Sequence, residues 1–331
     1  MSDERLITFG EATREAMAEE MRADERVFVY GEDIAKQGGI FGQFAGLKEE
    51  FGDRVLDTPI SETALVGAGV GAAIAGAKPV IDLHFADFIG IAMDEVLNQM
   101  AKAHYMFGGQ ADMSLVLRAP DGLMKHGAAQ HSQSLETWFT NIPGIRVVVP
   151  SDPRTGKALL KAAIEDPNPV IYFEHKGLFP VKGNVPIDDE PIDLGKAAVV
   201  REGTDVTLVS YSLMLSKALK AAQLVQDKYG LSVEVIDLRS IAPLDMGTIY
   251  KSVKKTGRLV IAHEAIKVGG VGGEIAARVA EHAFEYLDAP ILRVGAKFSP
   301  MPFSPGLEDY VLAGEPEITE ALLASVNVRR N

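Results

Sequence analysis

The sequence DTPISET at residues 57–63 runs directly into ALVGAGVGAAIAGA at residues 64–77, and this junction decides how the rest of the chain is interpreted. The second stretch has no charged residue and consists almost wholly of small ones, which predicts a helix over residues 64–77. Glycine destabilises a helix by roughly 1 kcal/mol relative to alanine. Gly67, Gly69 and Gly71 therefore indicate that something approaches the backbone of this helix closely.

Glu62 places a carboxylate at the mouth of the predicted helix. A carboxyl group among apolar neighbours tends to have a raised pKa, which suits proton transfer near neutral pH. The alternative is structural, with Ser61 as a helix cap and Glu62 as a first-turn acid that the helix dipole favours. Spacing alone leaves both interpretations open.

Composition predicts a globular protein of two domains. The 331 residues exceed the roughly 150 of one domain, and the 47% hydrophobic content can fill two cores. Cysteine is absent, which excludes disulfides, thiolate metal sites and a cysteine nucleophile. The net charge of −13 argues against nucleic acid or an anionic membrane as partner, because both require a basic face. A small-molecule substrate remains compatible, since a site sets its own local field.

The N-terminal residues also bear on location. Residues 1–6, MSDERL, are acidic and lack the basic and apolar regions of a signal or transit peptide. No apolar run approaches the roughly 20 residues of a membrane span. We therefore expect a cytoplasmic protein.

Runs of β-branched residues alternate with helical patterns, which is typical of parallel sheets covered by helices. The predicted strands are residues 27–30, 79–83, 114–118, 146–149, 170–173, 206–210, 233–237 and 258–262, with a helix over 215–229. The Pro-, Gly- and acid-containing stretch 183–191 interrupts the alternation and predicts a linker. The expected fold class is α/β in two domains, residues 1–185 and 196–331, joined by a linker at 186–195.

A polar segment, HGAAQHSQS at residues 126–134, follows one predicted strand. Open α/β sheets bind ligands beyond the carboxyl ends of their strands, so this segment is a candidate site. His126 and His131 are weak metal-ligand candidates, because no cysteine or acidic ligand lies nearby in the sequence. General acid–base chemistry or binding of a substrate carboxylate suits them better. The alternative is a loop satisfied by its own hydrogen bonds.

Other motifs allow two interpretations each. Phe88, in FADF at residues 85–88, can stack on a flat cofactor or belong to the core. Residues 67–71 lack the G-x-G-x-x-G order of a dinucleotide site. The glycines at 269–273 indicate close packing of a helix on a sheet rather than a phosphate cradle.

Together these segments resemble a known family, the β subunits of the thiamine diphosphate-dependent first component of 2-oxoacid and acetoin dehydrogenase complexes. The resemblance runs nearly end to end. Its motifs are YGED (30–33), RVLDTPISE (54–62), FADF (85–88), HSQSLE (131–136), VEVIDLR (233–239) and KTGR (255–258). It implies a transketolase-like fold, with a pyrimidine-binding domain followed by a C-terminal transketolase-type domain.

The resemblance also implies roles for individual residues. Glu62 matches the glutamate that hydrogen-bonds the aminopyrimidine ring of thiamine diphosphate and promotes deprotonation of its thiazolium carbon. Phe88 matches the residue that stacks on the pyrimidine, and Ile60 lies beside it. His131 matches the histidine that assists substrate binding and transfer to lipoamide, and His126 falls where some members also have histidine.

Metals and partners are implied in the same way. Asp166 and Asn168 resemble a structural potassium site of some members, although a polar loop before a strand is the alternative. The partner half of the family holds Mg²⁺ and the diphosphate through a Gly-Asp-Gly motif, whereas this chain has only GDR at residues 52–54. The resemblance therefore implies an α subunit in an α₂β₂ heterotetramer and a lipoyl-bearing acyltransferase core as partners.

The expected function is cleavage of a 2-oxo acid or acetoin next to its carbonyl, with transfer of the acyl group to lipoamide. Short motifs favour acetoin and pyruvate types slightly over branched-chain ones. The run DGLMK at residues 121–125 departs from the glycines of many members, which leaves substrate size and charge open. The alternatives are half of a split transketolase without a lipoyl partner, or a non-catalytic pairing subunit, against which intact Glu62 and His131 argue.

Overall fold

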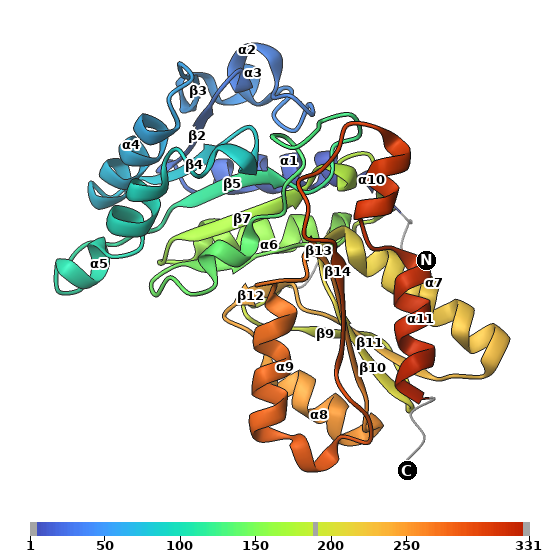
Figure 1. Ribbon diagram of the computed structural model, residues 1–331. Helices are drawn as coiled ribbons and strands as arrows, with labels where there is room; N and C mark the ends of the chain where they lie inside the picture. The colour runs from blue at the N-terminus through green and yellow to red at the C-terminus, as the bar shows by residue number, and fades with distance from the viewer. Residues whose placement is uncertain (1–4, 188–190, 327–331) are drawn as a thin grey trace.

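Strands and helices alternate through the computed structural model, which describes residues 5–187 and 191–326 (Figure 1). The strands are β1 (Leu6–Thr8), β2 (Val27–Gly31), β3 (Val55–Asp57), β4 (Lys78–Asp82), β5 (Val116–Asp121), β6 (Arg146–Val148), β7 (Val170–His175), β8 (Lys182–Asn184), β9 (Ala198–Arg201), β10 (Val206–Ser210), β11 (Val233–Asp237), β12 (Ser240–Ala242), β13 (Leu259–Ile266) and β14 (Leu292–Ala296). Each predicted strand overlaps one of these.

Most helices lie between strands in the sequence, and the last two follow β14. The helices are α1 (Phe9–Ala23), α2 (Ile34–Gln37), α3 (Leu47–Phe51), α4 (Glu62–Ile74), α5 (Ala103–Met106), α6 (Pro153–Glu165), α7 (Ser212–Tyr229), α8 (Met246–Thr256), α9 (Val271–His282), α10 (Pro305–Val311) and α11 (Glu315–Val326). Short helical turns include η2 (Ala86–Phe88), η3 (Glu95–Met100) and η4 (Glu136–Phe139). In the part of the chain that the structure describes, no helix is both long and apolar enough to span a lipid bilayer.

The first sheet has seven strands in the order β12-β6-β7-β5-β4-β2-β3. All neighbouring pairs are parallel except β12 with β6. β5 and β7 are buried along their whole length and β4 is buried from Pro79 onward, which accounts for their mostly apolar composition. Helices α1 and α6 cover one face, and α4 and η3 cover the other. The α/β fold class predicted from the sequence is confirmed.

The second sheet has five strands in the order β14-β13-β10-β11-β9, with only β9 antiparallel. Helices α8 and α9 pack on one face, whereas α7 and α11 pack on the other (Figure 1). Gly270 and Gly272 at the start of α9 lie against the imidazole of His263, so a Cβ at either position would crowd that ring. Close packing of helix on sheet therefore accounts for Gly270 and Gly272, as expected, whereas a Cβ at Gly269 would meet no atom of the described chain within 4 Å.

The stretch predicted as a linker is partly a strand. Gly183 and Asn184 lie in β8, which pairs antiparallel with β1 through Ile7 and Leu6. The backbone bonds of this short ribbon tie the beginning of the chain to residues 182–184, so the assignment of Gly183 and Asn184 to a linker was wrong. Residues 188–190 of the predicted linker lie outside the described residues.

One strand and one hydrophobic core connect the two halves of the chain. β12 lies between β11 and α8 in the sequence, yet it pairs with β6 at the edge of the first sheet. One continuous hydrophobic core joins residues of the first sheet, such as Leu117 and Phe173, to residues of the second, such as Ile236 and Ile261. The segment carrying α10 leaves the second sheet and lies beside the first domain (Figure 1).

Candidate active site

The carboxyl edge of the first sheet gathers the candidate residues. β2 and β4 are neighbours; β3 follows β2 on one side and β5 follows β4 on the other, so the chain leaves the ends of β2 and β4 in opposite directions. Ligands of open α/β sheets bind at such a point. Glu32 follows β2, Glu62 begins α4 after β3, and Phe88 follows β4. Residues 122–133 follow β5 at the same edge.

The glycines of α4 have two different explanations. A Cβ at Gly69 would overlap the side chain of Ile81 and the hydroxyl of Tyr30, so this glycine lets α4 pack directly on β2 and β4. A Cβ at Gly71 would meet no atom of the described chain within 4 Å. The predicted close approach is thus made by the chain's own sheet at Gly69, whereas the face around Gly71 is open.

Glu62 is the first residue of α4 and is only 7% exposed. Ser61 occupies the N-cap position, but its side chain makes no capping hydrogen bond. Glu32 lies nearby: burial raises the pKa of Glu32, and the charge of Glu62 raises it further. Oε1 of Glu32 is buried and has no hydrogen-bond partner within the described chain. Glu32 and Glu62 therefore offer buried carboxylate oxygens that can accept hydrogen bonds from a ligand.

His131 lies edge-on to two phenylalanine rings. Its ring centroid is 5.1 Å from that of Phe85 and 5.5 Å from that of Phe88, with interplanar angles of 89° and 88°. Phe85 is buried, whereas Phe88 is only partly buried. The structure thus brings Phe88 and His131 together and leaves part of the Phe88 ring uncovered by the described chain.

Residues 122–133, which we call the histidine loop, close on themselves. The amide of Gly122 donates to the carbonyl of Gln133 at 2.9 Å. The hydroxyl of Ser132 donates to the carbonyl of Met124 at 3.1 Å, and the amide of His131 donates to that of Ala128 at 3.5 Å. The loop therefore has internal bonds, and three carboxylates from elsewhere in the chain also bind its backbone amides.

Asp87 supports the histidine loop from the first domain. Its Oδ1 accepts hydrogen bonds from both the amide and the Nε2 of Gln133, each at 3.0 Å. Its Oδ2 lies 3.6 Å from the ammonium of Lys176, which also sits over the ring of Phe85. Because Asp87 immediately precedes Phe88, this contact couples the position of the Phe88 ring to that of the histidine loop.

Two carboxylates of the second domain support the same loop from the other side. Glu308 Oε1 accepts from the amide of His126 at 2.9 Å, and Glu264 Oε1 accepts from the amide of Leu123 at 2.8 Å. The His126 ring packs on Phe303, with centroids 5.5 Å apart. No ring contact within the described chain joins His126 to His131.

Ionisable groups form a buried cluster beneath the loop. Burial and the Glu136 carboxylate raise the pKa of Asp121, although Lys176 opposes this. Burial lowers the pKa of Lys176 despite the charges of Asp87 and Asp121. Burial alone would raise the pKa of Glu264, but His175, at 2.8 Å, lowers it to about 2. Sequence reasoning missed this cluster; the available signal was charged residues directly at the ends of β5 and β7.

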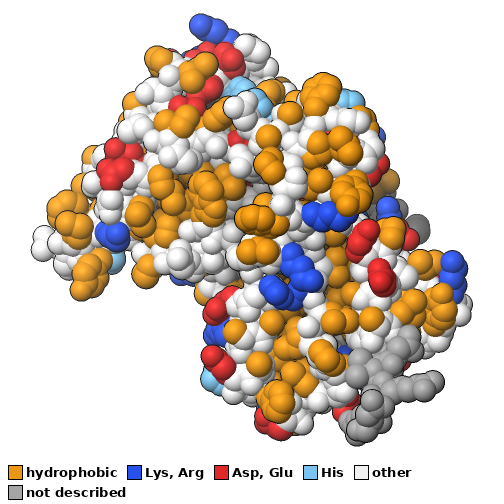
Figure 2. Space-filling view, viewed as in Figure 1, with side chains coloured by type: hydrophobic (Ala, Val, Ile, Leu, Met, Phe, Trp, Pro, Cys, Tyr) orange, Lys and Arg blue, Asp and Glu red, His pale blue; other side chains and the backbone are white. Residues whose placement is uncertain are grey.

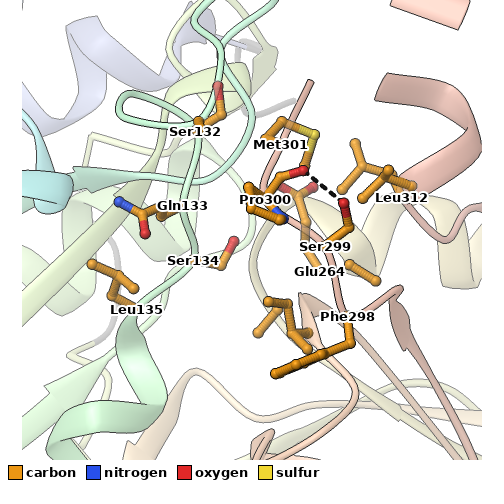
Figure 3. Close-up of a pocket in the computed structure, with 15 residues that line it drawn as sticks. Ser132, Gln133, Ser134, Leu135, Glu264, Phe298, Ser299, Pro300, Met301 and Leu312 are labelled. Carbon is orange, nitrogen blue, oxygen red and sulfur yellow. Dashed lines mark hydrogen bonds between the residues drawn. The ribbon is translucent and has the colours of Figure 1, made fainter. Parts of the chain in front are cut away.

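A cavity of about 410 Å³ adjoins the histidine loop (Figure 3). Residues 132–135 line one side, and residues of the second domain line the other: Glu264, Phe298, Ser299, Pro300, Met301 and Leu312. Most of the fifteen residues that line the cavity are apolar. The second domain therefore contributes directly to the surroundings of the loop that carries His131.

Asp166 and Asn168 lie before β7, away from the carboxyl edge. Asp166 Oδ1 accepts from the amide and the side chain of Asn168 at 2.8 Å, and Oδ2 pairs with Arg146 at 2.8 Å. The Asp166 carboxylate is thus already engaged by two donors and a cation. The potassium site stays a prediction.

Both halves of the chain match described protein families. Residues 5–182 match the transketolase pyrimidine-binding domain, and residues 195–318 match the transketolase C-terminal domain. A solved structure described as "Split gene transketolase, inactive beta4 tetramer" covers 98% of this chain and all of its own, with a TM-score of 0.80. Its 23% sequence identity makes this a likeness of fold.

Several curated relatives are similar over nearly the whole chain. The pyruvate dehydrogenase E1 component subunit beta of Rhizobium meliloti is 46% identical over 96% of this chain and 69% of its own length. The 2-oxoisovalerate dehydrogenase subunit beta of Bacillus subtilis is 42% identical over 96% and 98% of the two chains. The acetoin:2,6-dichlorophenolindophenol oxidoreductase subunit beta of the same organism is 46% identical over 96% and 97%.

Proposed function

The chain belongs to the transketolase-type β subunits of 2-oxoacid and acetoin dehydrogenases, and from this membership we propose that it is the pyrimidine-binding half of a thiamine diphosphate-dependent oxidoreductase. The enzyme cleaves a 2-oxo acid or acetoin next to its carbonyl and passes the acyl group to lipoamide. The observation that carries the proposal is the grouping of Glu62, Phe88 and His131 at one sheet edge.

The first part of the site suits the aminopyrimidine ring. Glu62 is a buried carboxylate at the N-terminus of α4, and the neighbouring Glu32 has a buried acceptor atom without a partner in the described chain. Both fit a ring that carries hydrogen-bond donors. The partly uncovered ring of Phe88 offers a flat surface for stacking. Glu62 would hold a proton on the pyrimidine and so promote the tautomer that activates the cofactor.

Bound thiamine diphosphate supplies an acidic thiazolium carbon and the electron sink for cleavage next to a carbonyl. This chain supplies the groups around it. His131, held edge-on to Phe85 and Phe88, would orient the substrate and hold or deliver a proton as the acyl group moves to lipoamide. A neutral imidazole accepts a proton and an imidazolium donates one, so one histidine serves both steps.

The rest of the site belongs to a partner. The chain lacks a Gly-Asp-Gly motif for the metal and diphosphate, so we assign Mg²⁺ and the diphosphate to an α subunit in an α₂β₂ heterotetramer. The open face of α4 around Gly71 and the 79% exposed Ile60 support a protein surface here. Thr63 Oγ1 donates to the carbonyl of Ile91, another exposed apolar residue. Figure 2 shows hydrophobic side chains gathered over this region and α5.

The candidate activities differ in their substrate and in the molecule that accepts the acyl group. Identity does not rank these substrates: relatives named for pyruvate are 42–46% identical, relatives named for acetoin are 44% and 46% identical, and one named for 2-oxoisovalerate is 42% identical. The slight preference for acetoin and pyruvate rests on the sequence motifs. A half of a split transketolase is the alternative within the same fold. Transfer of an acyl group to a lipoyl domain separates the two, because a transketolase has no lipoyl partner.

The proposal is tested by calorimetry with thiamine diphosphate and Mg²⁺. We expect weak binding to the isolated chain and tight binding after the α subunit is added, because the isolated chain contributes only the pyrimidine side of the site. Glu62→Gln in the complex tests the pyrimidine side of the site, and Glu281→Gln, an exposed substitution on α9, is its control and should bind the cofactor as the parent does. Tight Mg²⁺-dependent binding to the isolated chain would contradict the division between subunits.

A further inference from the structure

The histidine loop adopts a backbone conformation that its own residues do not favour. His126 and Ala128 have φ values of 61° and 56°, in the left-handed region that residues with a Cβ avoid. Gly122 has a φ of 75°, and a Cβ there would overlap His175 and crowd Glu264. Internal bonds such as that from the Gly127 amide to the Met124 carbonyl, at 2.7 Å, support this conformation, and bonds to groups outside the loop add to them.

Glu308 is placed to hold the histidine loop at His126, where φ is positive. Its side chain is almost fully buried, with the residue 2% exposed, and Oε1 accepts the amide of His126, whose own φ is positive. A hydrogen bond from an amide to a buried carboxylate is stronger than one between neutral groups. Phe303, which lies just before α10, contacts the same residue, with its ring centroid 5.5 Å from that of His126.

The remaining supports show what Glu308 adds. Asp87 holds the loop at Gln133, and Glu264 holds it at Leu123, near its two ends. Of these three carboxylates, Glu308 alone binds the middle of the loop, at the amide of His126. Its partner atom is a backbone amide, so the contact fixes the path of the chain rather than a side chain.

We propose that Glu308 is a positioning residue of the second domain that holds the middle of the histidine loop, and thereby the orientation of His131 toward Phe88. The consequence for catalysis rests on the function proposed above, whereas the conformational effect does not. A change that removes the acceptor should loosen residues 122–133 and lower acyl transfer. Cofactor affinity and thiazolium proton exchange, which depend on Glu62, should remain near parental values.

The test compares two substitutions of Glu308 that differ in whether they retain an oxygen acceptor. Glu308→Gln retains an oxygen acceptor, whereas Glu308→Met has similar length and no acceptor. Asp309→Asn, on the exposed side of α10, is the control. Amide hydrogen exchange of residues 122–133 is measured in the isolated chain, and cofactor binding, thiazolium proton exchange and acyl transfer in the complex with the α subunit. Glu308→Asp, which draws the carboxylate back by one methylene, replaces Glu308→Met if that variant does not fold.

We expect at least tenfold faster exchange at the His126 amide in Glu308→Met, at least tenfold slower acyl transfer, and recovery of both to within about threefold in Glu308→Gln. Unchanged loop exchange in the variants that remove or withdraw the acceptor would overturn the proposal. Faster exchange with parental acyl transfer would overturn its link to catalysis. If the parental complex neither binds the cofactor nor transfers acyl groups while exchange still responds, the positioning role stands and the proposed function fails.

Discussion

Arg118 and Glu174 form a bidentate ion pair in the middle of the first sheet, directly beneath the candidate site. Arg118 on β5 donates to Glu174 on β7 at 2.8 Å from Nε and 2.6 Å from Nη2, and neither side chain is exposed. The guanidinium also lies over the ring of Phe44. The pair links two neighbouring strands whose ends carry the histidine loop and Lys176.

Removing one partner of this pair should be costly. Glu174→Ala removes the carboxylate that the buried Arg118 guanidinium hydrogen-bonds and leaves it only the electrostatic interaction with Asp82, so we expect the free energy of unfolding to fall by about 3–5 kcal/mol. Urea denaturation followed by circular dichroism measures the change. The exposed pair of Arg22 and Glu50 provides the control, since Glu50→Ala should have a much smaller effect. Equal losses for the two variants would show that burial of the Arg118 pair is unimportant.

Asp82 should make stability depend on pH. Burial raises the pKa of Asp82 from its ordinary value of 3.8 to about 7, although Arg118 opposes the shift. The folded chain then holds a proton that the unfolded chain releases between these two values, so the free energy of unfolding falls as pH rises from about 4 to 7. Asp82→Asn removes this contribution. The unfolding free energy of Asp82→Asn minus that of the parent should rise from about pH 4 to pH 7 and level off above pH 7. A difference that stays constant with pH would refute the raised pKa of Asp82.

Glu62→Gln should preserve folding and assembly with the α subunit but remove most activity, because an amide cannot exchange the proton that cofactor activation requires. Exchange of the thiazolium proton with deuterium, measured by NMR in the complex, reports on this step directly. The assembled state is checked by size-exclusion chromatography. Exchange at the parental rate would show that Glu62 has no role in activation, and that its place at the start of α4 is structural.

His131→Ala should act later in the reaction. Cofactor binding is expected to stay nearly intact, because Glu62 and Phe88 remain, whereas transfer to a lipoyl domain should be slower by roughly 10²–10⁴-fold, the usual contribution of a general acid or base. Rapid-quench measurement of acylated lipoyl domain separates this step from cofactor binding. His126→Ala provides a comparison, since its ring packs on Phe303 rather than beside Phe88. Loss of cofactor binding in proportion to activity would make His131 a structural residue.

The regular parts of the fold were predictable because burial dictates their composition. Strands β10 and β11 were predicted with the bounds that the structure has, since both are apolar runs buried along their length. β12 was not predicted. It has three residues, and it becomes a strand only because the edge of β6 is available to pair with it.

Some residues of the candidate site were likewise predictable from the sequence, and others were not. Glu62, Phe88 and His131 could be proposed from the sequence because they follow strands or begin a glycine-rich helix. Glu264 and Glu308 could not, because each binds a backbone amide far away in the chain, and a backbone amide leaves no mark in the sequence. Such contacts depend on how the second domain sits against the first, which local patterns do not encode.

The pairing of β12 with β6 has a consequence for how the protein is made. The edge of β6 cannot be covered until residues 240–242 have left the ribosome, so the first sheet is completed only after β9, β10 and β11 have been synthesised. Until then a nascent chain presents an open strand edge and half of a hydrophobic core, both of which favour association between chains. We therefore expect translation that stops near residue 195 to yield aggregating fragments rather than a stable first domain.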